Sequence, residues 1–318
     1  MPTPAPRTHA VGRAARVIGR CAAVAAVAAL AAPEAAAQLA PVPVVPPPVL
    51  DTIVDDFRTA VQAARPALLG IAAGTFGVLA VIEIALSAIV WTLRESGPDR
   101  ILSALVLKLA WLAFAFGLIA SFSVWFPPVI EGFQQAGQAV APGVVSPGDV
   151  LGLGVQLSTS MVNSFFDGVG LMDLSFSLVA TAILVALAAF FVELMYAVIA
   201  AAVVVVIVES FIALAAGALV LGFAAFRGTA NLADRFVAYV FNLGIRLFSL
   251  FLLVGIGYNV AQTWLPVIQS SPDDVAAMLA VLGGSLTFTL LVVVIPYKVS
   301  TLLTRDLTVG FERALSSV

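Results

Sequence analysis

The sequence predicts an all-α polytopic membrane protein with about five net transmembrane crossings and a central periplasmic loop. Of its 318 residues, 62% are hydrophobic and only 10% are charged, whereas soluble domains have about 45–50% apolar and about 25% charged residues. Several apolar runs exceed the roughly 20 residues that a helix needs to cross a bilayer. The basic residues concentrate in segments on one side of the predicted membrane, which sets the orientation.

Residues 1–37 are predicted to be a secretory signal peptide. Four arginines precede the apolar stretch Cys21–Ala32, which is too short to remain as a membrane span. Ala35, Ala36 and Ala37 form a small-residue cleavage motif, so Gln38 is the expected first residue of the mature chain. For the first dozen residues, the alternative is a start codon placed too far upstream.

The predicted mature chain lacks the side chains of most catalytic and metal sites. His9 and Cys21 are the only histidine and the only cysteine, and both lie in the predicted signal peptide. Without them the chain has no disulfide, no thiolate nucleophile and no imidazole base or ligand, and no cofactor is predicted.

The formal net charge of −3 becomes more negative after cleavage, and the chain has no basic run. This composition argues against tight binding of nucleic acid.

The first part of the mature chain is expected to be a lead segment followed by a transmembrane hairpin. Residues 38–67 contain a proline-rich spacer and a short amphipathic helix, 52–64, expected at the membrane surface. Residues 68–126 form the hairpin, with spans at 68–93 and 101–126. Glu83 in the first span and Lys108 in the second lie toward the shared turn, which favours a structural ion pair. Lining of a water-filled path is the alternative.

Residues 127–173 are expected to form the periplasmic loop. Its first half is rich in glycine and proline, and its second half is an amphipathic helix. The helix should bury its apolar face against protein or lipid, and its other face could line a lumen or contact a partner. The polar side chains on that face are Gln156, Thr159, Ser160, Asn163 and Asp167.

Residues 174–297 are expected to form the transmembrane core, followed by a cytoplasmic tail, 298–318. The apolar stretch 174–226 is much longer than one crossing needs, yet too short for three. We expect a single net crossing by a broken or re-entrant helix, with the break between Glu193 and Glu209. A helical hairpin is the alternative. Two further spans are expected at 236–258 and 275–295.

The charge distribution predicts a periplasmic mature N-terminus and a cytoplasmic C-terminus. With one net crossing over 174–226, only Arg58 and Arg65 fall on the periplasmic side, whereas a hairpin there would move most basic residues outside. The basic residues on the predicted cytoplasmic side are Arg94, Arg100, Arg227, Arg235, Lys298, Arg305 and Arg313.

The stretch 208–257 carries opposite charges on two successive spans. Glu209 and Arg246 are expected to pair between these spans, because an unpaired charge within a membrane helix costs a few kcal/mol or more. Four glycines are interpreted first as sites of close helix packing and second as hinges. They are Gly217, Gly222, Gly255 and Gly257.

This stretch resembles the signature of the TrbL family, polytopic inner-membrane components of conjugative type IV secretion machines. The matching pieces include Glu209-Ser-Phe-Ile, Leu221-Gly222-Phe223, Arg227-Gly-Thr, Arg246 and Gly255-x-Gly257. Two departures are mild: Ala224-Ala225 stands where many relatives have two glycines, and Arg246 stands where the family often has lysine.

The resemblance implies a non-enzymatic channel or scaffold subunit in the bacterial inner membrane. Such a subunit would form a homo-oligomer, contact other secretion subunits and membrane lipid, and transiently meet a translocated DNA–protein or protein substrate. Separate ATPases would supply the energy, since this chain has no Walker A motif.

Two other classes of function compete with this interpretation. A secondary transporter would show an internal repeat with paired broken helices, and only one overlong segment is visible. An intramembrane enzyme would need converging carboxylates. Glu193 and Glu209 lie on different faces of one helix, at about 3.6 residues per turn.

Overall fold

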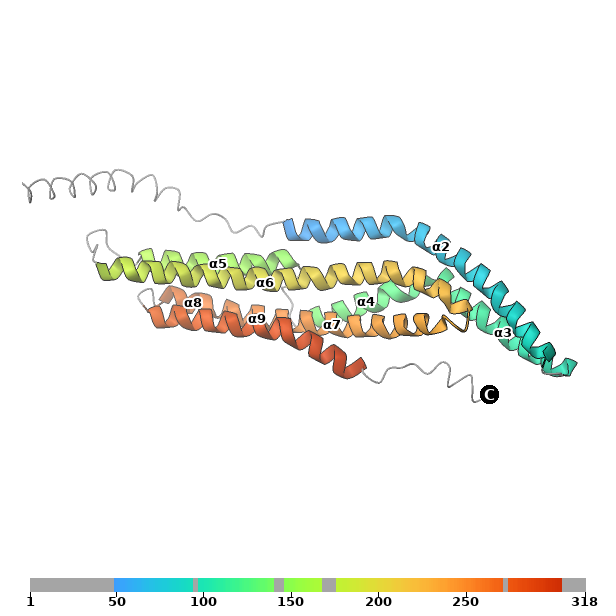
Figure 1. The fold of residues 1–318 in the computed structure, drawn as a ribbon. Helices are drawn as coiled ribbons and strands as arrows, with labels where there is room; N and C mark the ends of the chain where they lie inside the picture. The colour runs from blue at the N-terminus through green and yellow to red at the C-terminus, as the bar shows by residue number, and fades with distance from the viewer. Residues whose placement is uncertain (1–48, 94–96, 140–145, 168–175, 271–273, 305–318) are drawn as a thin grey trace, which may run out of the picture. The chain divides into compact units, whose positions relative to one another are not determined.

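The computed structural model describes residues 49–93, 97–139, 146–167, 176–270 and 274–304. Over these residues the chain is helical and contains no strand (Figure 1). The predicted signal peptide, most of the proline-rich spacer and the end of the tail lie outside the described residues. The helices are α2 (Val49–Leu93), α3 (Pro98–Ala120), α4 (Phe122–Ala139), α5 (Pro147–Asp167), α6 (Phe176–Leu221), the 3₁₀ turn η1 (Gly222–Ala225), α7 (Ala230–Gln262), α8 (Trp264–Ser270) and α9 (Val275–Thr304).

Five helical stretches are long and apolar enough to cross a membrane, which confirms the predicted class of an all-α polytopic membrane protein. Each contains a window of high hydropathy with few charges. The stretches are Val49–Leu93, Asp99–Ala120, Phe176–Ala225, Ala230–Ser270 and Val275–Leu303.

Helix α2 is continuous where the sequence suggested a short surface helix followed by a separate span. Pro66 lies inside it. Proline removes one backbone hydrogen bond and its ring crowds the preceding turn, which bends a helix without necessarily ending it. Alanines and leucines on both sides favour helix, and α2 bends along its length (Figure 1).

The second span ends earlier than expected, and a separate helix follows it. Helix α3 ends at Ala120, where the hydroxyl of Ser121 donates to the carbonyl of Gly117 at 2.6 Å. Helix α4 then runs to Ala139 and includes Pro127 and Pro128. The first half of the segment interpreted as a glycine- and proline-rich loop is therefore partly helical.

The overlong segment is present, but its break lies elsewhere. Helix α6 has 46 residues, a length of about 69 Å at ~1.5 Å per residue. The expected break between Glu193 and Glu209 is wrong, because α6 continues through both residues. The stretch between them contains neither glycine nor proline. The chain leaves α-helical geometry only at Gly222, where η1 begins.

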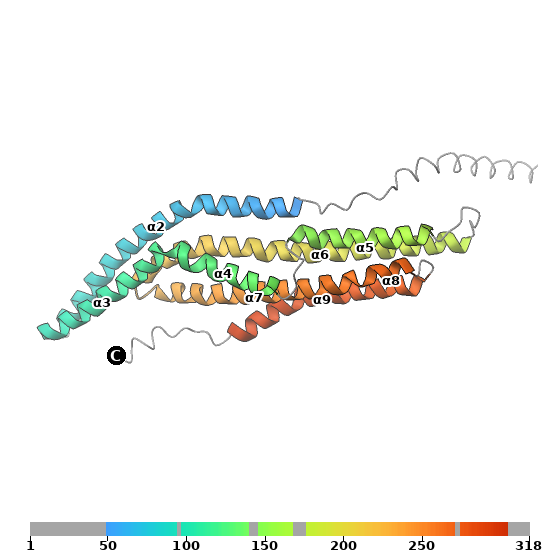
Figure 2. The same cartoon turned by 180° about the vertical axis from the view of Figure 1, so that it is seen from behind.

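Side-chain contacts fix the relative directions of the long helices. Gly217 faces Phe236 and Glu209 contacts Arg246, so α6 and α7 are antiparallel. Gly257 faces Phe288, whereas Asn242 donates to the carbonyl of Ser300, so α7 and α9 are also antiparallel. In both views α5 lies along the first part of α6 and α4 along α7 (Figures 1 and 2).

Several helices pack closely where a glycine of one meets an aromatic ring of another. Gly217 faces Phe236, Gly244 faces Phe133 and Gly257 faces Phe288. A methyl group at any of these glycines would overlap the ring. Gly222 is equally tight against backbone, since a Cβ there would lie 2.8 Å from the carbonyl oxygen of Ala72.

These contacts predict that Gly257→Ala destabilises the protein while Gly283→Ala does not. The first change forces a methyl group into Phe288, and overpacking of this kind costs about 1–3 kcal/mol. A Cβ at Gly283 meets nothing within 4 Å, and alanine favours a helix over glycine by about 1 kcal/mol. Thermal unfolding of the detergent-solubilised variants measures both effects. Equal midpoints for the two variants would contradict the packing argument.

Candidate functional site

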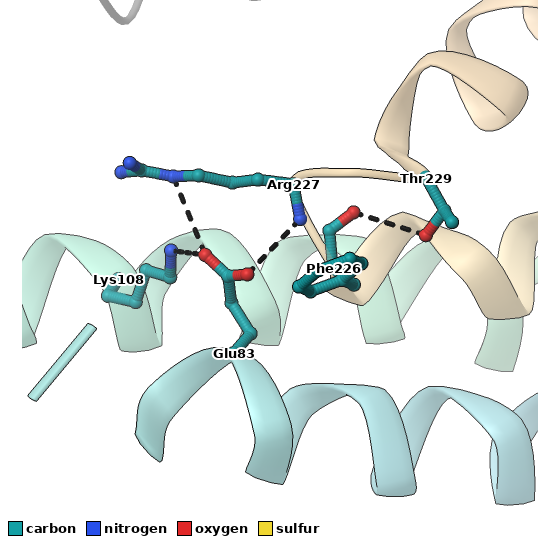
Figure 3. Close-up of polar contacts among 5 residues, drawn as sticks. All are labelled: Glu83, Lys108, Phe226, Arg227 and Thr229. Atoms are coloured by element: carbon teal, nitrogen blue, oxygen red, sulfur yellow. Dashed lines mark hydrogen bonds and ion pairs between the residues drawn. The ribbon is translucent and has the colours of Figure 1, made fainter. Parts of the chain in front are cut away.

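The first cluster of buried charge joins α2 to α3. Glu83 and Lys108 are both buried, and the Lys108 ammonium donates to Oε1 of Glu83 (Figure 3). The two side chains come from helices that the sequence placed in one hairpin. The structure therefore brings together the pair that the sequence suggested.

A third residue, Arg227, contacts the same carboxylate from the loop between η1 and α7. Its backbone N–H donates to Oε2 of Glu83 at 3.2 Å, and its Nε lies 3.5 Å from Oε1 (Figure 3). The loop is closed by Thr229, whose hydroxyl donates to the carbonyl of Phe223 at 2.7 Å and contacts that of Phe226 at 3.2 Å. Glu83 thus connects the first hairpin to the turn between α6 and α7.

Arg227 was used in the sequence analysis only to count charge, and its contact with Glu83 was missed. The basic side chain was a weak signal, because the shorter of its two contacts is made by a backbone amide that any residue except proline supplies. The proximity of a loop to a helix 144 positions away in the chain has no local sequence signature.

The second cluster joins α6, α7 and α9. Nη1 of Arg246 lies 2.6 Å from Oε2 of Glu209, and the Tyr239 hydroxyl donates to Oε1 of Glu209 at 2.8 Å. The guanidinium carbon of Arg246 lies 3.6 Å from the ring centroid of Tyr297, a geometry for cation–π attraction. The acid and the base are the pair expected from the sequence, and the two tyrosines are additional partners.

A further polar contact connects the start of α2 to the start of α5. Asp51 accepts hydrogen bonds from the Gly148 N–H and the Ser146 hydroxyl, each at 3.2 Å. Ser146 and Asp149 also bond to each other's backbone N–H groups, at 3.2 and 2.9 Å. A carboxylate and a reciprocal cap at a helix N-terminus satisfy donors that the helix itself leaves open.

The remaining predicted residues occupy separate places. Glu193 is exposed on α6, away from the Glu209 cluster. On α5, Gln156, Asn163 and Asp167 are exposed and Ser160 is half-buried, while the apolar face packs against α6. Gly255 is buried within α7. Among the described residues, no group of three or more histidine, cysteine, aspartate or glutamate side chains could hold a metal ion.

Fold and charge clusters together define a class: a multi-pass helical membrane protein in which opposite charges are paired between helices. The family described as TrbL/VirB6 plasmid conjugal transfer protein matches residues 80–295, which include the ion pairs of both clusters. The chain therefore belongs to the TrbL/VirB6 family, and the resemblance seen in the sequence is confirmed.

Two curated relatives agree with the family assignment. The chain is 26% identical over 248 residues to the probable conjugal transfer protein TrbL of Sinorhizobium fredii (strain NBRC 101917 / NGR234), and 24% identical over 249 residues to the conjugal transfer protein TrbL of Rhizobium radiobacter. Each alignment covers 78% of this chain and 61% of the relative. The chain thus spans about three fifths of the length of these relatives.

The second cluster predicts that Glu209→Ala prevents accumulation of folded protein. Arg246 is buried and Glu209 is half-buried, so the change leaves a buried guanidinium without its partner; for a fully buried pair such a loss costs about 3–5 kcal/mol. The double variant Glu209→Arg, Arg246→Glu should restore part of the loss. Size-exclusion chromatography and protease resistance of the purified membrane protein measure both.

Glu193→Ala is the matched control, because Glu193 lies exposed on the same helix outside this cluster. It should leave accumulation unchanged. If Glu209→Ala accumulates as well as Glu193→Ala, the pair does not hold α6 to α7.

Proposed function

We propose that the protein is an inner-membrane channel or scaffold subunit of a conjugative type IV secretion system. It would assist the passage of single-stranded DNA with its bound protein, or of a protein substrate, across the membrane. The observation that carries this proposal is the family match over residues 80–295. Two relatives bearing the name conjugal transfer protein support it, as do the five candidate spans.

The role is proposed to be structural rather than enzymatic. In both clusters the charged groups bond to one another and connect helices. Glu193 and Glu209, the acids of α6, do not converge on one site. A subunit of this kind depends on separate ATPases for the energy of transport.

The exposed polar face of α5 is the proposed lining of a water-filled path or of a partner contact. Gln156, Asn163 and Asp167 are exposed while the opposite face is buried. Because this face is mostly uncharged, it is better suited to brief contact with a translocated polymer than to binding that polymer tightly. Ser160 lies at its edge.

The protein is proposed to assemble as a homo-oligomer with other secretion subunits. Helix α6 exposes large apolar side chains along most of its length, from Phe176 to Ile212. Its length of about 69 Å exceeds the ~30 Å hydrocarbon core of a bilayer, even with a tilt of 40°. Lipid tails cannot cover the whole apolar face, and neighbouring subunits would cover the rest.

The proposed topology has a periplasmic N-terminus after cleavage within residues 1–37, a periplasmic segment 127–173 and a cytoplasmic tail 298–318. The excess of basic residues on one side supports it. Helix directions agree: α6, α7 and α9 alternate, and α2 runs parallel to α6, since Arg58 contacts Phe211 and Ala72 contacts Gly222.

Topology can be tested with single cysteines at Ser146, Thr229 and Ser270, in a variant whose Cys21 is also replaced. We expect Thr229→Cys to be labelled only from the cytoplasm, and Ser146→Cys and Ser270→Cys only from the periplasm. Labelling of Thr229→Cys from the periplasm would overturn the five-crossing topology.

Function is tested by deleting the gene from a conjugative donor. Transfer frequency should fall to the background of the assay, and the wild-type gene should restore it, with relaxase nicking of the plasmid unchanged. Normal transfer without the gene would refute the proposed role.

A further inference from the structure

The Glu83 cluster contains more positive than negative charge. Glu83 is the only carboxylate within ion-pair distance of Lys108 or Arg227 among the described residues. Its Oε1 contacts Lys108 and Nε of Arg227, and its Oε2 accepts from the Arg227 backbone. Among the described residues, one acid therefore faces two bases, so this part of the cluster has an excess of one positive charge.

That excess charge lies on the outside of the helices. The Arg227 side chain is 83% exposed, whereas those of Lys108 and Glu83 are 8% and 5% exposed. Figure 3 shows the Arg227 side chain extending past Glu83, with only Nε turned toward the carboxylate. No hydrogen bond or ion pair joins its two terminal nitrogens to another described residue, which leaves them available to a ligand.

The surroundings of Arg227 combine a membrane boundary with apolar surface. Its loop connects two candidate spans, Phe176–Ala225 and Ala230–Ser270, so it lies at the ends of two helices that are long and apolar enough to cross a membrane. Ile82 and Leu107, the sequence neighbours of Glu83 and Lys108, are exposed. The two helices that contact the cluster, α2 and α3, thus expose apolar side chains that acyl chains could cover.

We propose that Arg227 binds the phosphate of an anionic phospholipid headgroup. A guanidinium presents paired N–H donors in a fork that matches two phosphate oxygens, and basic residues at helix ends recruit anionic lipids. The acyl chains lie against the exposed apolar side chains of α2 and α3. The phosphate supplies the negative charge that the cluster lacks.

In this arrangement Glu83 is a positioning residue. It accepts from the backbone N–H of Arg227 and attracts Nε, which turns the other two nitrogens outward. Lys108 contacts the same carboxylate and holds it in place. The lipid contacts both the first hairpin and the α6–α7 turn, and its binding holds these parts together.

Native mass spectrometry of the full chain, released from detergent with added phosphatidylglycerol or phosphatidylcholine, tests the proposal. The wild type should retain phosphatidylglycerol in preference to phosphatidylcholine. Arg227→Gln keeps the backbone bond to Glu83 and removes the charge. Phosphatidylglycerol should therefore bind to this variant about tenfold more weakly than to the wild type. Arg227→Lys, which keeps the charge without the fork, should be intermediate.

Arg235→Gln is the matched control, because Arg235 is an exposed arginine close to the same loop but outside the cluster. It should bind phosphatidylglycerol as the wild type does. Equal affinity of Arg227→Gln and wild type would overturn the proposal. Displacement of the lipid by millimolar inorganic phosphate would also overturn it, since the site would then take free phosphate rather than a lipid. Circular dichroism and the thermal midpoint without lipid check that each variant is folded.

Discussion

The arrangement of the helices depends on one constraint: a charge placed among apolar helices must meet its opposite. A buried ion without a partner is costly, whereas a paired one is tolerated. Each ion pair here joins two consecutive helices, and the Arg227 contact joins the first hairpin to a loop 144 positions away. Glu83 bonds to Lys108 and to the Arg227 loop, and Glu209 bonds to Arg246. Apolar surfaces alone could slide past one another, but these contacts are satisfied in one arrangement only.

Close packing reinforces that arrangement around α7. Phe133 of α4 fills the space at Gly244, Phe288 of α9 fills the space at Gly257, and Phe236 of α7 fills the space at Gly217 of α6. If one helix slid along its neighbour by one residue, a side chain would take the place of each glycine and collide with the ring. The ion pairs therefore determine which helices lie side by side, and the glycine–aromatic contacts determine how far each helix is shifted along its neighbour.

The sequence predicted the membrane class, the overlong segment and the partners of both ion pairs, because these follow from hydropathy, length and the sign of charges. It did not predict where helices break. A boundary was expected between the surface helix 52–64 and the span 68–93, and an interruption between Glu193 and Glu209, yet α2 and α6 continue through these positions. Packing against neighbouring helices outweighs such local preferences, and a single sequence does not contain the neighbours. The Arg227 contact was invisible for the same reason.

The continuity of α6 has a mechanical consequence. From Phe176 to Ala216 the helix contains neither glycine nor proline, so it behaves as a stiff rod with no built-in joint. The Glu209–Arg246 contact is near one end of this rod, and the exposed Phe176 is at the other, about 50 Å away at ~1.5 Å per residue. A tilt of a few degrees at the ion pair displaces the far end by several ångströms. Movement on one side of the membrane would thereby reach the other side through a single element, without any change in its internal hydrogen bonds.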